Sequence, residues 1–453
     1  MGRMDKKTRH KLAAWVAGGL ISPQQAEAIE RHESHSGSDT SWGILIFAGF
    51  GAVVLGLGVI LLFAYNWAEM HKFTKLGIVF GSVTATHAAG LWLSRTRWPH
   101  GVAEAAHMLG SMLFGAGIWL VAQIYHISAH YPNAFLIWAA GAILLAWALP
   151  STAQGILGAV LLCIWACAEA MSYSNPVTFA PLLILATTGS LAWVRKSPTL
   201  LTVSAVSFTI AAVAGLPVND DGIFQVVLTI GLVFSAAAWM TRGHLEFPSA
   251  SPVLRTMSLV LYLPCLFILT FLDAAEDLVD FAFWEDAASA ERYALILLAL
   301  AAVTLTALAV HRAEKRGEVN SPEFRGLLCA PLVIFLTYTM MWWTVTMKIL
   351  HPAPESWPLV MTLLGNAVFI YHTVAWLWIG CRETRRGLVV SGSLMLAIWT
   401  FARFTDLFDS LLARGAMFMA MGGALFLVAT MYHRQRARVA RLATSPATTV
   451  MEG

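Results

Sequence analysis

Long apolar runs without a charged side chain recur along the whole chain, and they strongly limit what it can fold into. The stretch from Ile44 to Tyr65, for example, contains no charged residue. A helix needs about 20 such residues to cross a hydrocarbon core about 30 Å thick. Cutting the chain at its charged gaps gives about fourteen runs of suitable length. The sequence therefore predicts an all-α fold, a polytopic integral membrane bundle of transmembrane helices.

Three of these runs are short, at 134–149, 178–194 and 388–401, and each either crosses the bilayer or forms a buried or re-entrant segment. The predicted number of crossings is accordingly 12 to 14. The predicted spans are 44–65, 76–94, 105–124, 134–149, 153–171, 178–194, 199–216, 223–240, 254–272, 293–310, 327–346, 357–379, 388–401 and 416–432.

The basic residues fall mainly in alternate gaps between these runs. Of the 29 lysines and arginines, six lie in one set of gaps and the remaining 23 in the other set, which includes both chain ends. Lysine and arginine accumulate on the cytoplasmic side of membrane proteins. We therefore expect an even number of crossings and both termini in the cytoplasm. The six on the outer side are Lys72, Lys75, Arg292, Lys348, Arg403 and Arg414.

The composition narrows the partners and cofactors that we expect. Apolar side chains make up 58% of the chain and charged ones only 12%, so there are too few charged side chains to cover the surface of a separate soluble domain. A net charge of +3, concentrated on one side, indicates orientation in a membrane and no nucleic-acid partner. The five cysteines lie in or beside apolar runs, which predicts no disulfide framework, and no metal site or cofactor is expected.

A short helical hairpin is predicted ahead of the first span. After an apolar pattern of helical spacing, Gly18 and Gly19 supply a helix end. Ser22, Pro23 and Gln25 then form the start of a second helix, with a capping hydroxyl, a first-turn proline and the glutamine of a capping box. We divide the chain into a cytoplasmic head (1–40), a transmembrane bundle (41–433) and a basic, disordered cytoplasmic tail (434–453).

Three segments carry a resemblance to a known family. They are the head, LAAWVAGGLISPQQAEAIE, the end of the first span, FAYNWAEMHKFTKL, and the end of the third, VAQIYHISAHYPNAFLIWA. They resemble the membrane family called domain of unknown function 2157, and the closing FARFTDLFDSLLARGAMFMAMGGALFL is similar to its pattern. The resemblance implies a bacterial multi-spanning protein, and we expect it in the inner membrane. It implies no reaction and no site residue.

Four polar residues inside predicted spans are candidates for a functional path: His87, Glu169, Asn366 and His372. Ionisable groups within a bilayer are costly, and they persist only when they are paired, neutral or hydrated. Each can therefore be a structural group that bonds between helices, or part of a route for protons or substrate. Glu169 can also extend to water at the outer boundary.

The outer gaps hold a second group of candidates for binding a head group or an ion. These are His126, His130, Arg403, Asp406 and Arg414. Arg403 and Asp406 are three apart, so they can pair as a structural clamp, with recognition of an anionic head group by the arginines as the alternative. The acidic gap 273–291 alternates carboxylates with apolar residues, which predicts an amphipathic helix on the outer surface or a lid.

Small residues in the spans predict close contact between helices. Gly49, Gly51, Gly56 and Gly58 lie on one side of the first span, and Gly115 and Gly423 occur in later ones. Small side chains allow helix backbones to approach closely in a membrane.

The function remains open between three hypotheses. No nucleotide-binding, zinc-protease or nucleophile-elbow motif occurs in a suitable context. The leading hypothesis is a transport-type or lipid-binding and small-molecule-binding protein with an outward-facing groove. The alternative is a non-catalytic scaffold or assembly factor, and the third is a lipid-modifying enzyme of the outer face. Membrane lipids, and other membrane-protein subunits, are the expected partners.

Overall fold

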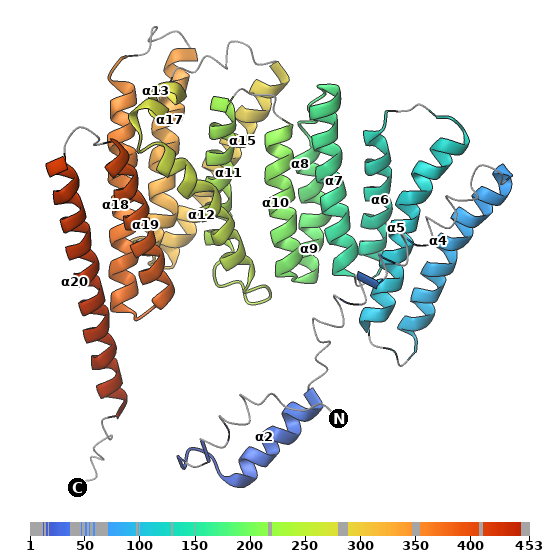
Figure 1. Cartoon of the computed structure of the whole chain (residues 1–453), viewed down its shortest axis with the longest axis horizontal. Coiled ribbons are helices and arrows are strands. Elements are labelled where there is room, and N and C mark those ends of the chain that lie inside the picture. The colour runs from blue at the N-terminus through green and yellow to red at the C-terminus, as the bar shows by residue number, and fades with distance from the viewer. Residues whose placement is uncertain are drawn as a thin grey trace. The chain divides into compact units, whose positions relative to one another are not determined.

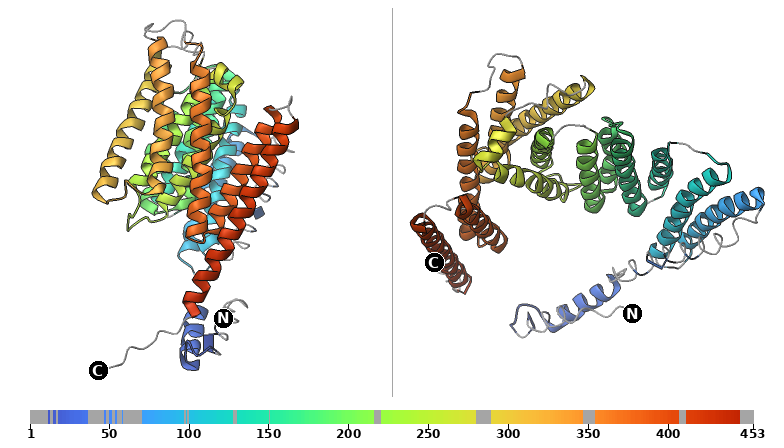
Figure 2. Two further views of the ribbon diagram at one scale, coloured as in Figure 1. Left: turned by 90° about the vertical axis from the view of Figure 1, so that its left-hand side faces the viewer. Right: turned by 45° about the horizontal axis from the view of Figure 1, so that its top comes forward.

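The computed structural model consists of helices and connecting turns (Figures 1 and 2). It describes residues 12, 15–16, 18–36, 47, 50–51, 54, 58, 71–96, 98, 100–127, 130–149, 151–215, 220–279, 289–346, 354–406 and 411–444. Within these residues there is no strand, in agreement with the predicted all-helical class. The chain forms two compact units, Met1–Leu161 and Leu162–Gly453.

The head shows the local structure that its sequence predicts. Gly19 has a φ of +69°, and Leu20 donates its backbone N–H to the Trp15 carbonyl at 2.9 Å, which closes the helix end. Helix α2 (Pro23–Ser36) then begins with a reciprocal capping box. Ser22 Oγ accepts from the Gln25 N–H at 3.1 Å, and Gln25 Oε1 accepts from the Ser22 N–H at 2.9 Å.

The first unit continues with α4 (Lys72–Ser94), α5 (His100–Ile124), α6 (Pro132–Ala148) and the start of α7 (Thr152–Tyr173). Helices α4 and α5 pack along their length, and α6 packs against α5. A side chain at Gly115 of α5 would overlap the Trp138 ring of α6, so the predicted close approach at this glycine is confirmed.

The second unit is built around α11. Its residues Val226, Leu228, Ile230 and Leu232 are all fully buried, and they point to more than one face of the helix, so α11 is the most enclosed long apolar helix among the described residues. The elements of this unit, with π-helical turns labelled η, are α8 (Ala180–Ile184), η1 (Leu185–Gly189), α9 (Ser190–Arg195), α10 (Pro198–Ala214), α11 (Asp220–Met240), α12 (Ala250–Ile268), α13 (Leu272–Val279), α15 (Ser289–Lys315), α16 (Pro322–Phe324), η2 (Arg325–Cys329), α17 (Ala330–Thr346), α18 (Trp357–Arg382), α19 (Arg386–Asp406) and α20 (Leu411–Thr444).

Every predicted span except 44–65, most of which lies outside the described residues, coincides with a helix or with consecutive helical segments. Among the described residues, eight helices are long and apolar enough to cross a membrane. Three further apolar helices are shorter: Pro132–Ala148, Ala180–Arg195 and Pro198–Ala214. The chain is therefore a membrane protein with several spanning helices, which confirms the predicted class.

Basic turns of the second unit meet at one end of it. Lys196 pairs with Glu246 at 3.4 Å, which joins the α9–α10 turn to the α11–α12 turn. Glu323, at the start of α16, pairs with Arg242 at 3.1 Å and with Arg385 at 3.7 Å. These turns belong to the alternate gaps that hold most of the basic residues. Basic gaps that are separate in the sequence therefore lie together at one end of the unit.

Two expectations about local structure differ from what is observed. Helix α20 continues to Thr444, so the first part of the tail that begins at 434 is helical, because alanine, arginine and leucine are strong helix formers. A Cβ at Gly51, Gly58 or Gly423 would meet no atom within 4 Å, so the close contact predicted there is absent among the described residues. Gly49 and Gly56 lie outside them.

Candidate functional site

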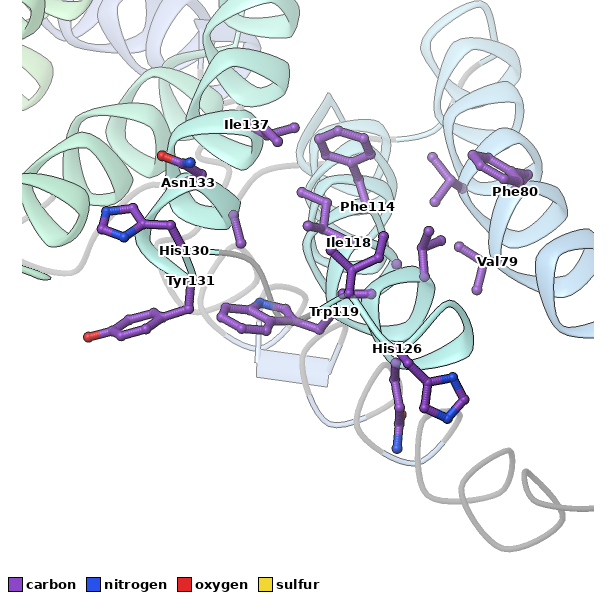
Figure 3. Close-up of a pocket in the computed structure, with 17 residues that line it drawn as sticks. Val79, Phe80, Phe114, Ile118, Trp119, His126, His130, Tyr131, Asn133 and Ile137 are labelled. Carbon is purple, nitrogen blue, oxygen red and sulfur yellow. The ribbon is translucent and has the colours of Figure 1, made fainter. Parts of the chain in front are cut away.

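A large groove lies in the first unit between α4, α5, α6 and the α5–α6 turn, and we call it the α4–α6 groove (Figure 3). Its volume is about 1030 Å³, at the upper end of the range for small-molecule sites. Phe114 and Ile118 of α5 lie opposite Val79 and Phe80 of α4. The other lining residues are Val83, Gly117, Trp119, Val121, Ala122, Gln123, His126, Ile127, His130, Tyr131, Asn133, Ala134 and Ile137.

The polar lining residues gather at the α5–α6 turn, which belongs to a predicted outer gap. Gln123, His126, His130 and Asn133 come from the end of α5, the turn and the start of α6. The remaining walls are apolar or aromatic. The groove thus has an apolar body and a polar end, which is the shape of a site for an amphiphile: an apolar chain with a polar head.

The backbone at this turn holds His126 in a left-handed conformation, with a φ of +53°. The Ile127 N–H donates to the Ala122 carbonyl at 2.9 Å, and the His126 N–H donates to the Gln123 carbonyl at 3.4 Å. This is the helix-ending motif in which glycine normally occupies the left-handed position. A histidine there costs conformational energy that a glycine avoids, and strained positions of this kind are frequent at functional sites.

His87, for which the sequence left a structural bond between helices and a role in a path both open, is paired with His107 of α5. Their Nδ1 atoms are 3.2 Å apart and their rings stack at 5.5 Å. One Nδ1 must carry a hydrogen and the other accept it. Each ring also covers a glycine of the opposite helix, because a Cβ at Gly90 would lie 2.7 Å from His107, and one at Gly110 would lie 2.7 Å from His87.

Glu169 is buried, with 4% of its surface exposed, rather than extended to water. Its carboxylate accepts from Trp165 Nε1 and from Asn175 Nδ2, each at 3.2 Å. Both donors come from α7 and the residues just after it. Two donors satisfy much of the hydrogen-bonding need of a buried carboxylate.

Asn366 bridges three helical segments of the second unit. Its Nδ2 donates to the Thr270 carbonyl at 3.0 Å and to the Thr362 carbonyl at 2.8 Å. Its Oδ1 accepts from Trp399 Nε1 of α19 at 2.9 Å. The Asn366 amide therefore links α18, to which it belongs, with α19 and with the turn that follows α12.

His372 has one occupied and one free ring nitrogen. It is 1% exposed, and its Nε2 lies 3.3 Å from the Tyr262 hydroxyl of α12. Its Nδ1 has no hydrogen-bond partner among the described residues. His372 and Glu169 bond to different partners within the second unit.

Arg403 contacts Thr270 and Phe271, which follow the end of α12. Its Nη2 donates to Thr270 Oγ1 at 3.3 Å, and its guanidinium lies 4.6 Å from the centre of the Phe271 ring. The side chains of Asp406 and Arg414 lie outside the described residues, so the predicted clamp stays a prediction.

The acidic gap begins as an amphipathic helix, α13. Ala275, Leu278 and Val279 are buried, and the Tyr338 hydroxyl donates to the Leu278 carbonyl at 2.9 Å. This part of the gap packs against the bundle. The segment 280–288 lies outside the described residues.

The structure thus brings His126 and His130 to one groove, and it brings Asn366 and Arg403 to the same residue, Thr270. Sequence reasoning missed His107 as the partner of His87. A signal was available, because the pattern His-x-x-Gly occurs both at His87–Gly90 and at His107–Gly110.

Comparison with known proteins finds a family match for one stretch of the chain. Residues 13–155 match the family of predicted membrane proteins called DUF2157, so the resemblance seen in the head and the following spans is confirmed over this stretch. The match includes all the residues that line the α4–α6 groove. No curated protein and no solved structure matches the chain.

Proposed function

We propose that this chain, a membrane protein with a DUF2157 region, binds an amphiphilic lipid in the α4–α6 groove. The observation that carries the proposal is the division of the groove into a long apolar body and a polar end. An acyl chain would lie against Phe114, Ile118 and Ile137, and its head group would meet His126 and His130. Burying apolar ligand surface contributes about 25 cal/mol for each Å².

Filling the groove tests this proposal. Ala134 of α6 lines the groove, whereas Ala140 of the same helix is exposed outside it. We expect Ala134→Trp to lower lipid retention about tenfold, equal to about 1.4 kcal/mol, because the indole occupies the acyl-chain space. Ala140→Trp adds the same indole to the same helix and should leave retention unchanged. Native mass spectrometry of the purified protein counts the lipids that remain bound.

The polar end has its own pair of variants. His126→Gly removes the imidazole but fits the left-handed backbone, whereas His126→Ala removes it and keeps the strain. Both should weaken lipid retention equally if the imidazole contacts the head group. Retention that falls only in His126→Ala would show that the turn geometry matters and the imidazole does not. Equal lipid retention by Ala134→Trp and the wild type would contradict the proposal as a whole.

A non-catalytic scaffold is the second candidate function. It is favoured by the local partners of His87, Glu169 and Asn366, each of which bonds between or within packed helices. The same partners give less support to a transport path through these residues. The retention experiment separates the candidates, since a scaffold without a lipid site loses nothing in Ala134→Trp.

We further propose a location in the bacterial inner membrane with about fourteen spans and both termini cytoplasmic. The meeting of Arg242, Arg385 and Lys196 at one end of the second unit supports this orientation. In intact spheroplasts, an impermeant thiol reagent should label Glu355→Cys, whose position belongs to an outer gap. It should label Arg316→Cys only after lysis. The reverse pattern would invert the topology.

A further inference from the structure

Two adjoining cavities open at the basic end of the second unit, and together we call them the basic cleft. Their volumes are about 220 and 200 Å³, and both are lined by Arg255, Glu323, Leu327 and Arg385. The first cavity also reaches Arg242, and the second also reaches His372. Arg255 comes from α12 and Glu323 from α16. The other walls include the turns between α11 and α12 and between α18 and α19, which lie at the lower end of these helices in Figure 1.

The cleft carries an excess of positive charge. Three arginines line it, against the single carboxylate of Glu323, which pairs with Arg242 and Arg385. Glu383 also bonds to Arg385, with Oε2 at 2.8 Å from Nε, and still leaves one positive charge uncompensated in this cluster. Arg255 has no hydrogen-bond or ion-pair partner in the described part of the chain.

The inner wall of the cleft presents a buried polar atom. When the Tyr262 hydroxyl donates to His372 Nε2, Nδ1 carries the hydrogen and is a free donor. Next to it lies Gly326, where an added Cβ would be 3.6 Å from Nδ1. Gly326 belongs to the π-helical turn η2, and such turns occur frequently at functional sites.

These groups extend from the surface into the unit. His372 precedes the end of α18 at Arg382 by ten residues, so it lies about 15 Å further along the helix axis. An anion that enters between Arg242 and Arg385 would meet Arg255 along the wall and the His372 Nδ1 at the inner end. The cleft therefore offers donors on several sides and a positive potential along its length.

We propose that the basic cleft is a binding site for a phosphate group. Guanidinium groups bind phosphate through two parallel charge-assisted hydrogen bonds, and Arg255 supplies a fork that no carboxylate occupies in the described residues. The excess positive charge selects an anion, and the small polar volume suits a head-sized group and not a long chain. This site is separate from the α4–α6 groove and does not depend on its function.

Titration of the full-length protein with inorganic phosphate in detergent tests the site. We expect saturable binding, measured by calorimetry in a chloride buffer, that Arg255→Gln weakens about tenfold or more. Arg255→Lys keeps the charge without the fork and should recover only part of the affinity. The matched control is Arg316→Gln, an exposed arginine of the same predicted side, which should change the affinity less than about twofold.

The same site can take its phosphate from a phospholipid head group, and nanodiscs distinguish the two sources. If the ligand is a phospholipid, the wild type will have a higher melting temperature in phosphatidylglycerol nanodiscs than in phosphatidylcholine nanodiscs. The same comparison for Arg255→Gln will give a much smaller difference. If the ligand is free phosphate, added inorganic phosphate will raise the melting temperature of the wild type, and the change of lipid will not. A wild type that responds to neither overturns the proposal, as does a response that Arg255→Gln and Arg316→Gln retain equally. A normal gel-filtration profile of Arg255→Gln shows that the variant is folded.

Discussion

Replacing Gly90 by leucine is expected to destabilise the packed pair α4–α5 by about 3 kcal/mol or more. Even the first side-chain carbon at this position would lie 2.7 Å from the His107 ring, closer than real Cβ contacts allow. The ring cannot rotate away without losing its stack on His87 and the 3.2 Å contact between the two Nδ1 atoms. The variant therefore loses packing and a hydrogen bond together, and the free energy of unfolding in mixed micelles measures the loss.

The same helix supplies a matched control, because a Cβ at Gly81 would meet no atom within 4 Å. Gly81→Leu should change the free energy of unfolding by less than about 0.5 kcal/mol. Gly90→Ala combined with His107→Ala should be more stable than the sum of the two single changes predicts, since removal of the ring leaves room for the new methyl group. Strict additivity of the two changes would contradict the interlocked packing described for α4 and α5.

The features that the sequence predicts correctly are those with local causes. The capping box of Ser22 and Gln25 spans four residues and involves no other part of the chain, so its residues define it. The apolar runs are similarly local, because the length needed to cross a bilayer is a property of a single helix. The α-helical class and the positions of most helices follow from these patterns.

The features that could not be predicted depend on distant partners. Asn366 bonds to Thr270 and Trp399, which lie 96 and 33 residues away. No spacing rule within one helix relates such positions. For the same reason, no local pattern indicates that Arg403 Nη2 donates to Thr270, which lies 133 residues earlier.

The α4–α6 groove has residues that the sequence singles out and residues that only the packing of helices brings together. His126 and His130 were identified from sequence as polar residues of an outer gap, and the structure places both at the polar end of the α4–α6 groove. Its apolar walls come from ordinary span residues such as Phe80 and Ile118, which look like any other lipid-facing or core residue in a sequence. Only the packing of three helices shows that they enclose one space.

Replacing Asn366 by leucine is expected to destabilise the second unit by about 3 kcal/mol. Leucine has the same number and branching of side-chain heavy atoms as asparagine, but it removes three hydrogen bonds and leaves Trp399 Nε1 and the Thr270 carbonyl without their amide partner. Polar groups left unpaired in a membrane-spanning region are costly, because lipid offers no replacement. Mixed-micelle unfolding of the purified variant, compared with the wild type, measures the difference.

A double-mutant cycle distinguishes this bridging role from a role in ligand handling. Trp399→Phe removes the donor, so it should cost less when Asn366 is already leucine than in the wild type, with a coupling of about 1 kcal/mol. Asn366→Asp keeps an oxygen for Trp399 and should retain that coupling. If Asn366 instead serves a path for substrate, Asn366→Leu will leave the free energy of unfolding near the wild-type value and the cycle will show no coupling. The bridge between α12, α18 and α19 would then contribute little to stability, and the polar groups of the spans would have to be explained by function.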